Sequence, residues 1–115
     1  MVRIKKIPAA FYQSGTGRHP VREWLKDLNA EDRKVIGADI ATVEYGWPVG
    51  MPTCRPLGQG LWEVRSTLRR NRIARVIFGI VRNEMVLLHG FIKKTQKTPV
   101  EDLAFARQRL KEVEL

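Results

Sequence analysis

The segment that decides the fold runs from Leu61 to Lys97 and reads LWEVRSTLRRNRIARVIFGIVRNEMVLLHGFIKKTQK. It contains three runs rich in apolar and β-branched residues, at 61–68, 72–82 and 85–92, with short polar segments between them. This composition predicts three consecutive antiparallel strands joined by tight turns. The second run is apolar almost throughout, which is typical of a central strand.

The same segment carries almost all of the net charge of the chain. Between Arg65 and Lys97 there are nine basic residues and one acidic residue, Glu84, so this span has a net charge of +8, against +9 for the whole chain. Because concentrated like charge opposes compaction, folding does not account for this pattern. We therefore expect a polyanionic partner, with nucleic acid as the first candidate. The nine basic residues are Arg65, Arg69, Arg70, Arg72, Arg75, Arg82, Lys93, Lys94 and Lys97.

The sequence before this segment predicts a strand and two helices. Residues 2–12 favour a first strand, which Pro8 restricts to an edge or a bulge. Pro20 begins a helix whose apolar residues follow one helical face. Asn29 caps a second helix, and the two helices are expected to form an antiparallel hairpin that covers one face of the sheet. Residues 46–60, rich in glycine and proline, are expected to form a loop.

The sequence after this segment predicts a C-terminal helix. Thr98 is expected to cap it, with Pro99 at the first helical position and Glu101 completing a capping box. The predicted order is therefore strand, helix, helix, three strands, helix (β-α-α-β-β-β-α). This order predicts an α+β fold in which helices pack on a mainly antiparallel sheet.

The register of the first two predicted strands decides whether two arginines meet. If the turn between the strands consists of residues 69–71, Arg65 and Arg75 lie directly opposite each other. Like charges so placed are unfavourable by roughly 0.2–1 kcal/mol. The placement is tolerable if a ligand phosphate, or Glu63 nearby, lies between the two guanidinium groups. A two-residue turn removes this pairing, so the register stays open.

The composition indicates a globular protein. The chain has 115 residues, 43% of them hydrophobic, and we expect one domain at 1–115 with one core. No apolar run approaches the roughly 18 residues that span a bilayer. Cys54 is the single cysteine, which fits a reducing, cytoplasmic environment. The two histidines, His19 and His89, are far apart, so we expect neither a metal site nor a cofactor.

Several stretches together resemble one family of proteins. They are Leu57–Arg65, Arg75–Phe78 and Leu88–Pro99. In this order and with this charge pattern, the chain resembles the RelE/HigB toxins of bacterial type II toxin–antitoxin modules, in particular the phage-derived Gp49-like branch. The resemblance covers about half of the chain, from Leu57 to Leu115, and the two N-terminal helices match in order and length.

This resemblance implies a RelE-like toxin domain that enters the ribosomal A site and cleaves mRNA. It also implies a cognate helix-turn-helix antitoxin of the HigA type, which blocks the active site. Carried over residue by residue, it implies catalytic roles for Arg65, Arg75, Lys93 and Lys94. Four further residues are expected to bind RNA, mainly by docking to the phosphate backbone. They are Arg69, Arg70, Arg72 and Lys97.

RNA cleavage of this kind uses the ribose 2′-hydroxyl as its own nucleophile and requires no metal ion. The enzyme orients the hydroxyl, transfers protons and stabilises the charge that builds on the phosphoryl oxygens. Arg65 and Arg75 suit charge stabilisation, because the guanidinium fork matches phosphate geometry. The lysines of the 93–97 segment are candidates for acid or base, and so is His89.

Each of these roles has a structural alternative. The lysines can contact phosphate without taking part in catalysis, Arg75 can form a structural ion pair with Glu63, and His89 can be a buried, hydrogen-bonded histidine. Many RelE toxins carry a tyrosine near the C-terminus that stacks on a base. From Pro99 onward the one aromatic residue of this chain is Phe105. Stacking on a base must therefore come from elsewhere, from Phe91 or Trp47, or be missing.

Two other functions are compatible with the same sequence. One is a non-catalytic basic module that binds RNA or a ribosomal site. The other is an interaction protein whose C-terminal helix and sheet serve only an antitoxin-like partner. A steep loss of binding with salt points to phosphate contacts and against a protein-only interface.

Overall fold

The computed structural model describes residues 3–93 and 97–114 of the chain. These residues form three α-helices, five strands and the short 3-10 helix η1 (Arg69–Asn71). In chain order, the other elements are β1 (Ala9–Phe11), α1 (Pro20–Asp27), α2 (Ala30–Gly46), β2 (Cys54–Gly58), β3 (Leu61–Thr67), β4 (Ile73–Val81), β5 (Glu84–Ile92) and α3 (Val100–Glu114). No helix in this described part of the chain is long and apolar enough to cross a membrane.

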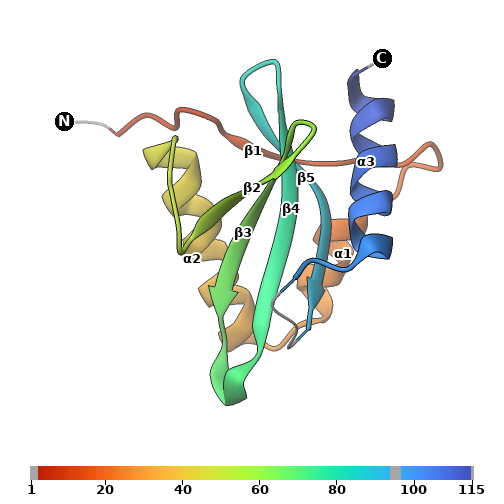
Figure 1. Cartoon of the computed structure of the whole chain (residues 1–115). Helices are drawn as coiled ribbons and strands as arrows, with labels where there is room; N and C mark the ends of the chain where they lie inside the picture. Colours follow the sequence, from red (N-terminus) through yellow and green to blue (C-terminus); the bar gives the residue numbers. More distant parts are fainter. Residues whose placement is uncertain (1–2, 94–96, 115) are drawn as a thin grey trace.

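The five strands form one sheet in the order β1-β5-β4-β3-β2 (Figure 1). β1 runs parallel to β5, and every other neighbouring pair is antiparallel. The predicted central strand is therefore β4, and the first strand lies at an edge of the sheet, directly after Pro8. The expected α+β architecture with a mainly antiparallel sheet is confirmed.

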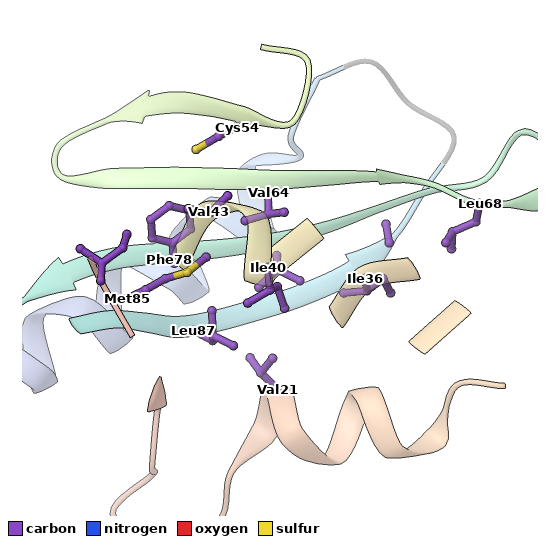
Figure 2. Close-up of a cluster of buried hydrophobic side chains, with 13 residues drawn as sticks. Val21, Ile36, Ile40, Val43, Cys54, Val64, Leu68, Phe78, Met85 and Leu87 are labelled. Atoms are coloured by element: carbon purple, nitrogen blue, oxygen red, sulfur yellow. The ribbon is translucent and has the colours of Figure 1, made fainter. Parts of the chain in front are cut away.

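Helices cover both faces of this sheet. α1 packs on β5 and α2 on β3, while α3 packs on β4 and β5. Figure 2 shows the core on the α1 and α2 side, where Val21, Ile36 and Ile40 face the sheet residues Phe78 and Leu87. A second core lies between the sheet and α3 and consists of Tyr12, Leu61, Ile77, Val86, Leu88, Phe91, Ala106 and Leu110.

Gly90 sets how closely α1 approaches the sheet. A Cβ atom at this position of β5 would lie 2.5 Å from the ring of Trp24, which belongs to α1. Glycine in a strand interior commonly marks such a close approach. The glycine beside His89 therefore has a packing role on the face opposite α3.

The structure differs from the sequence prediction in the segment 46–60, which was expected to be a loop. Its second half forms β2, in which Cys54 pairs with Val64 and Pro56 pairs with Trp62. Pro56 has no N–H to donate, and an edge strand tolerates this residue. Pairing with the edge of β3 thus outweighs a local composition that is typical of loops.

Both ends of the chain also differ from the prediction. The first strand covers only Ala9–Phe11 of the predicted span 2–12. The C-terminal helix begins at Val100, one residue after the predicted start at Pro99. The Thr98 hydroxyl donates a hydrogen bond to the Glu63 carboxylate. The Thr98 side chain therefore contacts the sheet, and its predicted capping role stays a prediction.

Candidate functional site

Charged side chains gather on the face of the sheet that α3 covers. The turn after β3 is η1, so the three-residue turn is confirmed and Arg65 pairs directly with Arg75. On the neighbouring strands, Arg55 of β2 lies opposite Glu63 of β3, and Phe91 of β5 lies opposite Arg75 of β4. Because side chains alternate between the two faces of a strand, these residues all project toward α3.

Glu63 is the centre of this cluster, and its side chain is completely buried. Its Oε1 atom lies 3.7 Å from Nε of Arg65 and 3.6 Å from Nε of Arg75. Its Oε2 atom lies 3.5 Å from Nη2 of Arg55 and accepts the hydrogen bond from Thr98. The carboxylate lies between the opposed arginines and offsets their repulsion, so the ion pair between Arg75 and Glu63 is present.

Arg75 is also completely buried. Its Nη1 atom donates a hydrogen bond of 3.0 Å to the carbonyl oxygen of Lys97, and its guanidinium lies 5.8 Å from the Phe91 ring centre. Burial lowers the pKa of Arg75, although the nearby Glu63 carboxylate opposes this effect. In this conformation Arg75 lies beneath the chain segment that leads into α3, and it does not reach solvent.

Arg65 and Arg55 are the guanidinium groups of this cluster that reach the surface. The side chain of Arg65 is 17% exposed and that of Arg55 is 27% exposed. Arg65 also lines an open hollow of about 440 Å³ at the end of β3, next to α2, together with Thr67 and with Val35 and Asp39 of that helix. Because Arg75 is completely buried, a phosphate group that approaches the cluster meets Arg65 and Arg55 before Arg75.

A second cluster lies at the first turn of α3, around Asp102. Its Oδ1 atom lies 2.6 Å from Nε2 of His89, and its Oδ2 atom lies 2.9 Å from Nζ of Lys93. Burial raises the pKa of Asp102, but the hydrogen bonds from Lys93 and His89 outweigh this and hold the pKa below its usual value. His89 is thus hydrogen-bonded and mostly buried, as its structural alternative expects, and its ring stacks on Phe105.

The turn arginines have different surroundings. Arg72 forms a bidentate ion pair with Asp32, at 2.7 and 3.0 Å, and Arg69 forms an ion pair of 2.7 Å with Glu31. These contacts tie η1 to the first turn of α2, and the Arg72 hydrogen bonds lower the pKa of Asp32 despite its burial. Arg70 is exposed, has a positive φ of 62° and forms no ion pair within the described ranges.

The lysines after β5 are only partly described. The side chain of Lys93 is 43% exposed beside Asp102, and Lys97 is exposed while its carbonyl oxygen accepts from Arg75. Lys94 lies outside the described residues, so its predicted catalytic role stays a prediction.

The candidate stacking residues separate clearly by exposure. Phe91 is 7% exposed. Trp47 packs edge-on against Trp62 and Phe78 in the core between the sheet and the N-terminal helices. Phe105 on α3 is 55% exposed. Of these three rings, only Phe105 presents a large surface to solvent.

Three members of the site were not predicted from the sequence. Arg55 lies in a segment expected to be loop, Thr98 was assigned to a helix cap, and Asp102 resembles an ordinary acidic residue of a first helical turn. Each of them joins the site through a contact between distant parts of the chain. Such contacts form only when strands pair or a helix packs on the sheet, so the local sequence does not show them. Across the described ranges, no three His, Cys, Asp or Glu side chains lie close enough to hold a metal ion.

A comparison with protein families shows which family this chain belongs to. A family model described as "Phage derived protein Gp49-like (DUF891)" matches residues 23–111. This match covers well over half of the chain, so the chain belongs to the Gp49-like family, a family of RelE-like toxins. A search among curated proteins finds no match.

Proposed function

We propose that this protein is the toxin of a type II toxin–antitoxin system and that it cleaves mRNA in the A site of translating ribosomes. The observation that carries the proposal is the cluster in which three guanidinium groups surround one carboxylate on the α3 face of the sheet. The cluster keeps a surplus of positive charge where two of its arginines reach the surface. An RNA phosphodiester supplies an anion of matching geometry.

In the proposed reaction, the ribose 2′-oxygen attacks the adjacent phosphorus and forms a new O–P bond. The bond from phosphorus to the 5′-oxygen breaks, and the electron pair of this bond stays on the leaving oxygen. The 2′-hydroxyl proton is taken up by a base, and the leaving oxygen receives a proton from an acid. The products are a 2′,3′-cyclic phosphate and a 5′-hydroxyl end.

The side chains divide these tasks by their exposure. Arg65 contacts the phosphoryl oxygens directly, and Lys93 adds positive charge from the position just after β5. Arg75 supports the same charge from beneath, and it contacts substrate only if the segment from Lys97 to Pro99 moves. Lys93, Lys94 and His89 are the candidates for proton transfer.

The remaining basic residues dock the protein on RNA. Arg69, Arg70 and Lys97 have exposed side chains, which supports a role in contacting backbone phosphates. Arg72 is more fully engaged with Asp32. These contacts position the protein without reading sequence. We further propose that the cognate antitoxin is a helix-turn-helix protein of the HigA type and that the toxin acts in the cytoplasm.

The test is primer extension on an mRNA incubated with the purified protein, with and without translating ribosomes. The proposal predicts cuts at discrete codon positions only when ribosomes are present. Cuts in free mRNA contradict the ribosome dependence and indicate a general ribonuclease.

A second candidate function is a non-catalytic module that binds RNA or a ribosomal site. The complete burial of Arg75 favours it, because a buried guanidinium serves structure more directly than phosphate chemistry. The same primer-extension experiment separates the two functions, since a binding module produces no cuts under either condition.

A further inference from the structure

Glu63 is a buried acid that no step of the proposed reaction uses. The described residues contain one other glutamate buried to a similar degree, Glu44 of α2, which is 6% exposed. Glu44 accepts a hydrogen bond of 2.7 Å from the backbone N–H of Ala9 and pairs with Lys5 at 3.1 Å. Glu44 thus fastens the N-terminal segment, whereas Glu63 contacts the arginines of the site.

The charges around Glu63 exceed what a structural ion pair requires. A single guanidinium in good geometry balances one buried carboxylate, yet three lie within 3.7 Å, on β2, β3 and β4. An apolar pair of similar volume in place of a buried ion pair often folds as well or better. Stability alone therefore does not explain an acid at this position.

The contacts of Glu63 also join the two halves of the site. Its Oε2 atom accepts from Thr98, and Arg55 Nη2 lies 3.3 Å from the same hydroxyl. Thr98 is followed four residues later by Asp102, which holds His89 and Lys93. The carboxylate thereby fixes the sheet arginines relative to the start of α3.

We propose that Glu63 is the positioning residue of this site, because its carboxylate orients Arg55, Arg65 and Arg75 and fastens the segment leading into α3 over them. The proposal rests on the proposed function, since it assigns Glu63 a task in the cleavage reaction. Without the carboxylate, the guanidinium groups repel one another and lose their fixed orientation, while the overall positive charge that attracts RNA increases.

The test uses Glu63→Gln, which keeps the size of the side chain and removes its charge. Single-turnover cleavage of ribosome-bound mRNA is measured over a range of protein concentrations, all in excess over ribosomes. A positioning role predicts that the rate at saturating protein falls about 100-fold, the loss expected for misplaced catalytic groups. It also predicts that the half-saturating concentration does not rise, because the attraction to RNA is retained.

A purely structural role gives the opposite pattern. If the substitution only lowers the folded fraction, more total protein is needed for half-saturation, and the rate at saturation equals that of the wild type. Glu44→Gln is the matched control, because it neutralises the other buried glutamate away from the arginine cluster. We expect the structural pattern for Glu44→Gln. The same pattern for Glu63→Gln overturns the proposal.

A second measurement does not depend on cleavage. In an NMR spectrum of the arginine Nε–Hε groups, the wild type is expected to show dispersed, slowly exchanging signals for Arg65 and Arg75. In Glu63→Gln these signals are expected to move toward the positions of exposed arginines, while the backbone amide spectrum stays folded. Unchanged arginine signals overturn the proposal. If Glu63→Gln does not fold, Glu63→Asp replaces it, and its retracted carboxylate is expected to shift the same signals.

The two measurements keep this inference separate from the proposed function. A wild-type protein that cleaves no mRNA contradicts the proposed function, and the arginine spectrum then still decides whether Glu63 orients the guanidinium groups. A wild type that cleaves, with Glu63→Gln equally fast at saturation, contradicts the positioning role alone.

Discussion

Arg65 and Arg75 face each other across β3 and β4, yet the surroundings of the two side chains differ. Arg75 has no exposed surface and contacts Glu63 and the Lys97 carbonyl, whereas Arg65 reaches the surface beside an open hollow. Their sequence patterns alone do not distinguish them, since both are single arginines in apolar strands. The difference comes from the segment that crosses the sheet before α3, which covers one arginine and leaves the other accessible.

The buried ion cluster predicts an asymmetry between its two central members. Glu63→Met leaves the guanidinium groups without the carboxylate between them, and removing one partner of a buried pair costs about 3–5 kcal/mol. Arg75→Met costs less, because Glu63 keeps Arg55, Arg65 and Thr98 as partners. Urea denaturation of both variants measures the difference in the free energy of unfolding. An equal loss in the two variants contradicts this view of the cluster.

The ion pairs of Asp102 predict a dependence of stability on pH. The pKa of Asp102 is lower in the folded protein than in the unfolded chain. The charged carboxylate therefore stabilises the fold fully above about pH 3.9, the usual pKa of aspartate. This contribution is lost as the pH falls through the lower pKa of the folded protein. Wild type is therefore expected to be more stable than Asp102→Asn at neutral pH, and the difference should shrink below about pH 4. His89 and Lys93 are the side chains that contact the carboxylate oxygens.

Urea denaturation between pH 2 and 7 tests this expectation. Asp27→Asn serves as the control, because Asp27 is exposed at the end of α1 and forms no ion pair within 3–93 and 97–114. Its difference from the wild type should stay small at every pH. A difference between wild type and Asp102→Asn that does not change with pH contradicts the proposed contribution of the charged carboxylate.

At the scale of elements, the sequence predicts the long strands and the helices well. β3 and β4 lie within the predicted runs, and β5 begins one residue before its run, at Glu84. Asn29 caps α2, with its side chain accepting from the Asp32 backbone N–H. β2 was not predicted, because its segment contains proline and glycine, which are typical of loops. The strand is stabilised by pairing with β3, and local sequence does not show that pairing. Local pattern predicts elements with strong periodicity, whereas an edge strand depends on the pairing that the rest of the sheet offers.

The contact between α1 and β5 gives a prediction at this scale. Gly90→Ala places a Cβ atom against the ring of Trp24, and such overpacking costs about 1–3 kcal/mol. Gly37→Ala is the matched control, because Gly37 lies exposed in α2 with no atom within 4 Å of an added Cβ. Alanine there should stabilise the helix by roughly 0.5–1 kcal/mol. Thermal unfolding compares the two, and a stable Gly90→Ala variant contradicts the close approach.

At the scale of the whole molecule, the sequence predicts the fold class, and the structure adds how the layers lie. The predicted helix pair covers one face of the sheet, and α3 covers the other face, where the charged cluster lies. The excess of basic residues in the 65–97 span predicts an anionic partner, but it does not show which arginines are buried. Burial of these arginines depends on tertiary contacts. Residues 97–99 cover Arg75, and the acids Glu63 and Asp32 pair with Arg75 and Arg72 only in the folded chain.

The central claim is that the arginine cluster on the α3 face of the sheet cleaves ribosome-bound mRNA. The most direct measurement is the rate of primer-extension cuts on programmed ribosomes for wild type, Arg65→Ala and Arg22→Ala. Both variants lose one arginine, but Arg22 is exposed on α1, away from the cluster. We expect Arg22→Ala to cleave like the wild type and Arg65→Ala to be slower by roughly 100-fold or more, the effect of losing one charge-stabilising group. Equal cleavage by the two variants contradicts the claim.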